Sequence, residues 1–71
     1  MVIEEENDFI VNFQYENATK AQIEELQKIL VRRGYYVGGS GKEVDGIRGN
    51  RTKNALKSEL NKINSQEEYL E

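Results

Sequence analysis

The 71-residue sequence contains no cysteine and no histidine, and these two absences exclude several kinds of site. Without cysteine the chain can form neither a disulfide nor a thiolate metal site to reinforce a small fold. Without histidine it lacks the commonest general base and the usual zinc ligand. Nucleophilic systems that pair serine or cysteine with histidine are excluded as well. The sequence therefore predicts a chain that is not an enzyme, with no cofactor and no metal.

Long apolar runs are also missing. No run approaches the ~20 residues that a membrane-spanning helix requires. The first residues are acidic and lack the basic and apolar regions of a signal peptide, so we expect none in this chain and no membrane partner. A mature product, an excised domain and a cytoplasmic protein all remain open, and the localisation is unknown at this point.

Charge is unevenly distributed along the chain. The formal net charge is −3, from 10 basic and 13 acidic residues, which argues against a dedicated nucleic-acid binder. Both ends are acidic, whereas the middle is basic. There Lys42, Arg48, Arg51, Lys53 and Lys57 outweigh Glu43 and Asp45. Such a chain could present one basic face to an anionic partner.

All 6 glycines lie between residues 34 and 52, in the segment around which the chain is organised. Glycine accepts positive φ without steric cost, so this segment must turn several times within a short distance. Segments with helical apolar spacing flank it on both sides. A chain of this length forms one small domain. We expect two helices that enclose a structured, functional loop.

Residues 1–18 support two interpretations. Phe9, Val11, Phe13 and Tyr15 alternate with other residues, and this period of two predicts a short strand or an extended arm. Helical spacing remains open, because Phe9 and Phe13 are four residues apart. We expect the arm to lie against the helices or to pair outside the chain.

The first predicted helix begins after Thr19, a good N-cap, and extends to about Arg33. Gly34 is expected to end it in the left-handed C′ conformation. Of the two tyrosines that follow, Tyr35 and Tyr36, we expect one to point inward and the other to line a groove. The buried face comprises Ile23, Leu26, Gln27, Ile29 and Leu30.

The loop itself is predicted to be flexible and exposed from Val37 to Lys42. Val44 and Ile47 then anchor the returning chain, and Asp45 forms a turn by bonding the backbone ahead of it. Asn50 is a plausible N-cap for the second helix. The apolar face of that helix comprises Thr52, Ala55, Leu56, Leu60 and Ile63.

The C-terminal end is predicted to form a separate helical turn. Ser65 and Glu68 have the spacing of a capping box, after which Tyr69 and Leu70 could close over the core. The expected organisation is therefore an arm at residues 1–18, a helical core at 19–64 and a turn at 65–71.

The pattern of these residues resembles the peptidoglycan-binding domain family found beside bacterial and phage cell-wall hydrolases. That family has a helix with Leu-Gln at its centre, a glycine stop, a loop, and then Asp-Gly-x-Phe-Gly-x-x-Thr-x-x-Ala. The matching residues here are Leu26-Gln27, Gly34, Asp45-Gly46, Gly49, Thr52 and Ala55. The match covers about residues 20–60. The resemblance implies an all-α, small three-helix bundle with a long glycine-rich loop, and leaves room for the extended N-terminal arm.

The sequence departs from the family pattern at three places. Arg48 occupies the position of an aromatic residue, and Asn50 replaces a frequent proline. Glu59-Leu60 replaces the usual Phe-Gln. Residues 1–18 match nothing in the pattern.

The resemblance implies a non-catalytic module that binds peptidoglycan or a muropeptide and targets a linked or associated protein to the bacterial wall. Its location would then be the cell wall or periplasm. The alternative is a protein–protein interaction module on the same fold, in phage or bacterial assembly or regulation. We expect Gln27, Gly34, Asp45, Gly46, Gly49 and Thr52 to form the structural motif. The predicted ligand-binding residues are Tyr35, Tyr36, Arg48, Asn50 and Arg51.

Overall fold

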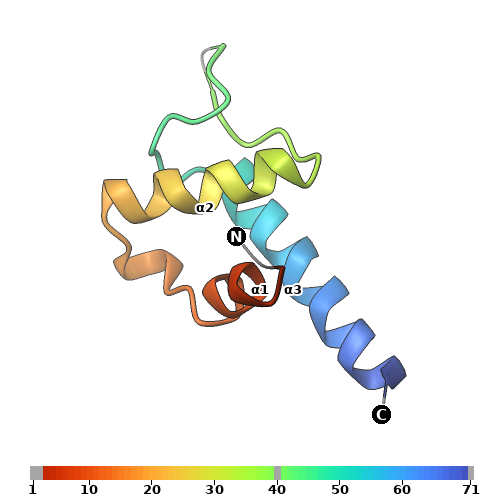
Figure 1. Ribbon diagram of the computed structural model, residues 1–71. Coiled ribbons are helices and arrows are strands. Elements are labelled where there is room, and N and C mark those ends of the chain that lie inside the picture. Colours follow the sequence, from red (N-terminus) through yellow and green to blue (C-terminus); the bar gives the residue numbers. More distant parts are fainter. Residues whose placement is uncertain (1–2, 40, 71) are drawn as a thin grey trace.

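The computed structural model describes the backbone of residues 3–39 and 41–70, and the side chains of residues 5–39 and 41–65. The described residues form helices and no strand, which confirms the all-α prediction. In Figure 1, α2 crosses the first turns of α3, and α1 packs beside α3. The end of α3 extends away from the other helices, which accounts for the molecular dimensions of 41 × 23 × 22 Å. The elements are α1 (Ile3–Val11), the 3-10 helix η1 (Tyr15–Asn17), α2 (Lys20–Arg32) and α3 (Asn50–Leu70).

Both ends of α2 are defined by local hydrogen bonds. The Thr19 hydroxyl accepts a bond from the Gln22 N–H, and the Gln22 side chain accepts one from the Thr19 N–H, which makes a capping box. At the other end Gly34 has a φ of 96°. The N–H groups of Gly34 and Tyr35 then donate to the carbonyls of Val31 and Leu30, the pattern of a Schellman motif. The predicted bounds of this helix are thus confirmed.

One apolar cluster joins the three helices. Leu26 and Leu30 of α2 are fully buried, as is Ile10 of α1. The contributions of α2 and α3 agree with the apolar stripes predicted from the sequence, whereas the burial of Ile10 was not predicted. The buried members of the cluster are Ile10, Leu26, Ile29, Leu30, Val37, Ala55, Leu56 and Ile63.

The prediction of a strand in residues 1–18 is wrong, because α1 and η1 are helical. In a strand Ile10 would point away from the face that carries Phe9 and Val11. In the helix Ile10 faces the core instead, and the rings of Phe9 and Phe13 meet with centroids 5.4 Å apart. Spacing of four residues, rather than two, describes this segment.

The predicted break at residue 65 is also wrong, because α3 continues without interruption from Asn50 to Leu70. The sequence from residue 50 onward contains no glycine or proline, so nothing in it forces the helix to stop. Ser65 therefore lies inside the helix and begins no new turn. The expected packing of Tyr69 and Leu70 concerns side chains outside the described residues.

The loop between α2 and α3 differs from its prediction at three residues. Val37 and Gly38 are buried, although this stretch was expected to be exposed. A Cβ atom on Gly38 would overlap the carbonyl oxygen of Lys42 and lie 2.7 Å from that of Glu43. The expected anchor Ile47 is instead 63% exposed. The loop is therefore anchored through its first residues and its backbone, and not through the Ile47 side chain.

Candidate functional site

A buried glutamine, Gln27, joins α2 to the loop and to α3. Its side-chain oxygen accepts hydrogen bonds from the backbone N–H groups of Asp45 and Gly46, at 3.0 and 2.8 Å. Its nitrogen donates to the Asp45 carboxylate at 2.8 Å and to the Thr52 hydroxyl at 3.0 Å. Buried polar groups are tolerated when they are paired in this way. Gln27 thus fastens the loop to both helices from a position that is 0% exposed.

Asp45 closes the loop on itself. One carboxylate oxygen accepts from the N–H of Ile47 at 2.9 Å, which forms an Asx turn, and the other accepts from the N–H of Gly39 at 2.9 Å. Hydrogen bonds from Gln27 and from the Ile47 N–H hold the pKa of Asp45 below its ordinary value of 3.8. The carboxylate is therefore charged at neutral pH, and its oxygens are engaged by the protein.

Gly46 lets the loop approach α2. Its φ is 71°, and a Cβ atom there would lie 2.7 Å from a side-chain carbon of Lys20 and 3.0 Å from one of Glu24. Thr52 completes the attachment on the other side, because its hydroxyl donates to the Val37 carbonyl at 3.4 Å. The loop is therefore held at its beginning and at its end.

The start of α3 is tied to the N-terminal segment through Gly49. The Gly49 carbonyl accepts from the Lys53 N–H at 3.1 Å and from the Tyr15 hydroxyl at 2.7 Å. Burial raises the pKa of Tyr15, so its hydroxyl remains protonated and able to donate. Asn50 is the first residue of α3, and Gly49 accepts the first helical hydrogen bond. The predicted N-cap at Asn50 is thus one residue too late.

An open pocket of about 410 Å³ lies outside this junction, between the loop and the start of α3. Asp45, Asn50 and Arg51 contribute polar side chains to its lining, and Ile47 contributes apolar surface. The Arg51 guanidinium donates to the Gly38 carbonyl at 3.1 Å and lies 4.7 Å from the centre of the exposed Tyr36 ring. Arginine over an aromatic face is a favourable cation–π arrangement. The lining residues are Val37, Gly38, Gly39, Asp45, Ile47, Gly49, Asn50 and Arg51.

The structure brings only some of the predicted ligand-binding residues together. Asn50 and Arg51 line this pocket, and Tyr36, which does not line it, contacts Arg51 through its ring. Arg48 lies to one side, where it donates to the Glu16 carbonyl and shares a second, smaller hollow with Asn50. Tyr35 turns inward against the core, and its hydroxyl oxygen is buried. Ile47 lines the pocket but was not predicted as a site residue, although an apolar residue between Asp-Gly and Arg-Gly in a loop is a visible signal.

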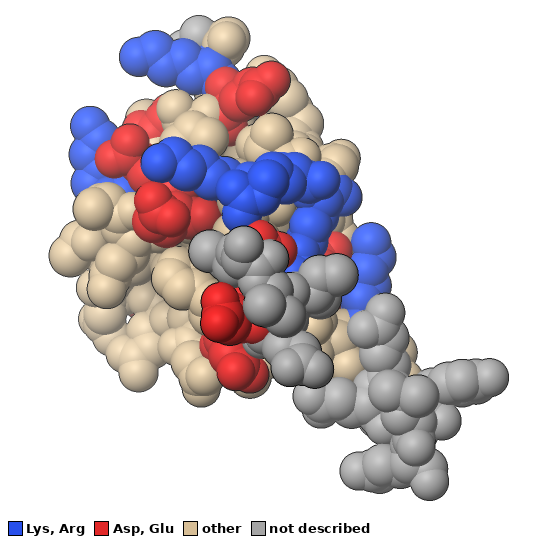
Figure 2. Space-filling model, viewed as in Figure 1, with Lys and Arg blue, Asp and Glu red and all other residues tan. Residues whose placement is uncertain are grey.

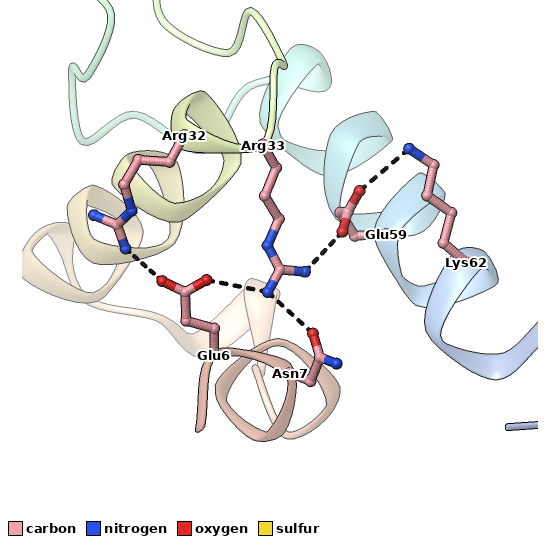
Figure 3. A network of polar contacts seen from close by, with 6 residues as sticks. All are labelled: Glu6, Asn7, Arg32, Arg33, Glu59 and Lys62. Atoms are coloured by element: carbon pink, nitrogen blue, oxygen red, sulfur yellow. Dashed lines mark hydrogen bonds and ion pairs between the residues drawn. The ribbon is translucent and has the colours of Figure 1, made fainter. Parts of the chain in front are cut away.

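A polar network that links all three helices was also missed (Figure 3). Arg33, directly after α2, donates to Glu59 of α3 at 2.8 Å and to Glu6 of α1 at 3.1 Å. It also donates to Asn7 at 3.0 Å, while Arg32 pairs with Glu6 at 2.7 Å. Burial alone would lower the pKa of Arg33, but its hydrogen bonds to Glu59 and Glu6 outweigh this effect and raise it.

Charge on the surface is mixed. On the face shown in Figure 2, basic side chains lie among acidic ones, so this face does not carry a single sign of charge. Within the described residues, no three aspartate or glutamate side chains gather where they could hold a metal ion. Nor does any described helix have the length and apolar character needed to cross a membrane.

Comparison with known proteins identifies one family. The model of the family described as "Putative peptidoglycan binding domain" matches residues 19–58, more than half of the chain. This range contains α2, the loop and the first part of α3, and leaves out α1 and η1. Neither a curated protein nor a solved structure matches the chain closely enough to count as a relative.

Proposed function

Because the chain belongs to the peptidoglycan-binding domain family, we propose that it is a non-catalytic module that holds a linked or associated protein at the bacterial cell wall. Such a module raises the concentration of its companion at the polymer surface without new contacts by the companion itself. The observation that best supports this role is the placement of Arg51, which lines an open pocket and lies over the exposed ring of Tyr36.

The side chains around the pocket suit the chemistry of peptidoglycan. The guanidinium of Arg51 has five N–H donors and is well shaped for the carboxylates of a peptide stem. One of its nitrogens already bonds the Gly38 carbonyl, which fixes the orientation of the others. The Asn50 amide can both donate to and accept from amide groups, and Tyr36 and Ile47 offer apolar surface to a sugar ring. The ligand would thus meet three or four side chains on a fixed backbone.

A binding role, as opposed to catalysis, is supported by the state of the carboxylates. Asp45 lies closest to the pocket, and its lowered pKa makes it a poor proton donor near neutral pH. Its oxygens accept hydrogen bonds from Gln27, Ile47 and Gly39. Asp45 therefore acts as a fastening of the loop in this proposal, and not as a general acid or base.

Co-sedimentation with purified sacculi tests the proposal. We expect the folded chain to be retained at low salt, and Arg51→Gln to weaken retention by roughly tenfold through loss of a charge-assisted contact. Tyr36→Ala should weaken it as well. Lys57→Gln removes a positive charge from an exposed position of the same helix and should leave retention unchanged. No retention of the folded chain, or equal retention of Arg51→Gln, would overturn the proposal.

The alternative is a protein–protein interaction module on the same fold. Addition of a strand from the N-terminal arm is no longer a route, because that segment is helical. The exposure of Val11, Tyr36 and Ile47 is the observation that keeps the alternative open. Recovery of one specific protein from native lysate, together with failure of sacculi to retain the chain, would favour this reading.

A further inference from the structure

A pocket of about 590 Å³ lies between α1, η1 and the first turn of α2. Its size falls within the range of 300–1,000 Å³ that is typical of ligand sites. It shares no lining residue with the pocket around Arg51. Most of its lining precedes residue 19, where the family match begins. The lining residues are Glu5, Asp8, Phe9, Asn12, Phe13, Gln14, Asn17, Ala18 and Gln22.

Among the described residues that line this pocket, the charged side chains are the carboxylates of Glu5 and Asp8. Glu5 and Asp8 are three residues apart on α1, and a separation of three places side chains on neighbouring turns of the same helix face. Glu6 lies between them in sequence but turns to the other side, where it pairs with Arg32 and Arg33. Thus α1 uses one carboxylate to join the helices and presents two others at the pocket.

Two aromatic rings form the apolar wall of the pocket. Phe9 and Phe13 are half-buried, and their ring planes are inclined at 52°. One side of each residue packs against the core cluster, which limits its movement. The other side is free to contact the aliphatic stem of a ligand, and aromatic faces also attract cations.

Packing of the core explains only some of the side chains that line this pocket. It accounts for the buried sides of Phe9 and Phe13, since both pack against the cluster that contains Ile10. It does not account for a cavity whose remaining wall consists of carboxylates and side-chain amides. The Asn12 amide nitrogen already donates to the Asp8 carbonyl at 2.9 Å, whereas the amides of Gln14 and Asn17 are groups that can pair with the backbone of an extended peptide.

We propose that this pocket, called here the α1 pocket, binds a lysine or arginine side chain presented by a segment of a partner protein. The aliphatic stem lies on Phe9 and Phe13, and the cationic head lies between the carboxylates of Glu5 and Asp8. The amides hold the flanking peptide backbone. The chain would then have two separate surfaces, with Arg51 facing the wall and α1 facing the partner.

The test is an NMR titration of the full chain with two acetylated and amidated peptides, Gly-Leu-Lys-Leu-Gly and its norleucine analogue. We expect the lysine peptide to shift backbone amide signals of residues 5–22 and to leave those of residues 36–51 unchanged. The norleucine peptide has the same stem without the charge and should bind about three- to tenfold more weakly. Added salt should weaken binding of the lysine peptide, because exposed ion pairs are screened.

Variants make the test specific. The double variant Glu5→Gln/Asp8→Asn keeps the shape of the pocket and should lose about three- to tenfold in affinity for the lysine peptide. The control Glu43→Gln/Glu25→Gln removes two exposed carboxylates elsewhere and should bind normally. Equal affinity of the two peptides, equal binding by the double variant, or signal shifts outside residues 5–22 would overturn the proposal.

Retention of variants by sacculi distinguishes this proposal from the function proposed above. Retention by sacculi should be the same for the double variant Glu5→Gln/Asp8→Asn as for the unchanged chain. If retention falls in that variant, ammonium groups of the wall itself occupy the α1 pocket, and the assignment to a protein segment is wrong. Loss of retention in Arg51→Gln, by contrast, concerns only the pocket around Arg51.

Discussion

At the scale of single residues, Gln27 forms the contacts on which the candidate site depends. It satisfies two backbone N–H groups of the loop and bonds the side chains of Asp45 and Thr52. An apolar residue of similar size would fill the same space but leave these groups unpaired. An unpaired buried polar group costs about 1–3 kcal/mol.

Replacement of Gln27 by leucine tests this role. We expect Gln27→Leu to lower the free energy of unfolding by about 2–4 kcal/mol, measured by urea denaturation, because several loop groups lose their partner. The exposed residue Gln14 provides a control, since Gln14→Leu should change stability by less than about 0.5 kcal/mol. If Gln27→Leu unfolds at the same urea concentration as the unchanged chain, the loop is held by other contacts.

Two glycines of the loop provide a second test at this scale. A Cβ atom on Gly38 would overlap backbone oxygen, whereas one on Gly49 would meet nothing within 4 Å. We expect Gly38→Ala to destabilise the chain by about 1–3 kcal/mol or more, since a well-packed site must shift to accept the methyl group. Gly49→Ala should cost much less. Thermal melting of both variants measures the difference, and equal melting temperatures would contradict the described path of the loop.

At the scale of helices, the N-terminal segment is joined to the rest of the chain at positions that depart from the family pattern. Arg48, which stands where the family has an aromatic residue, donates to the carbonyl of Glu16 in η1. Glu59, another departure, is buried and binds Arg33, which in turn binds Glu6 of α1. Two residues that depart from the family pattern thus connect the family-like part of the chain to α1 and η1. These two elements lie outside the residues that the family model covers.

The ion pairs among the three helices predict a dependence of stability on pH. Hydrogen bonds from Arg32 and Arg33 lower the pKa of Glu6 below its ordinary value of 4.5. Burial raises the pKa of Glu59, but the hydrogen bond from Arg33 and neighbouring charges bring it below the same value. The folded state thus binds fewer protons than the unfolded state. The ion pairs of Glu6 and Glu59 therefore stabilise the fold above about pH 4.5, and this stabilisation is lost as the pH falls through the lowered pKa values of the two carboxyl groups.

Urea denaturation at pH 7, 4.5 and 3 measures this effect. We expect the free energy of unfolding to fall at the lower pH values, with Asp45 adding to the loss because its pKa is also lowered. The variant Glu6→Gln should begin less stable and lose less stability on acidification. Stability that is constant or rises between pH 7 and 3 would show that these ion pairs contribute nothing.

At the scale of the whole molecule, the sequence alone predicted the helices whose apolar residues recur with a clear helical period. The apolar stripe of α2 runs from Ile23 to Leu30, and the helix is bounded by Thr19 and Gly34, so few alternatives exist. By contrast, α1 has only 9 residues, and Phe9 and Phe13 fit a strand as well as a helix until the burial of Ile10 is known. The secondary structure of such a short segment depends on how it packs against the rest of the chain.

The candidate site was predictable in part for a similar reason. A glutamine on an apolar stripe and an Asp-Gly pair in a loop both signal local hydrogen bonds, and Gln27 and Asp45 do bond each other. The pairing of Arg33 with Glu6 and Glu59 joins residues 26 or 27 positions apart, and no local pattern indicates it. Which side chains face outward in the loop, such as Ile47, is likewise set by the backbone turns at Asp45 and Gly46.

The central claim is that the loop fastened by Gln27 and Asp45 displays the wall-binding surface. The most direct test is an NMR titration of the full chain with soluble muropeptides released from sacculi. We expect amide signals of residues 36–39 and 45–52 to shift, and those of residues 5–22 to remain in place. Absence of shifts at saturating muropeptide, or shifts confined to residues 5–22, would contradict the account.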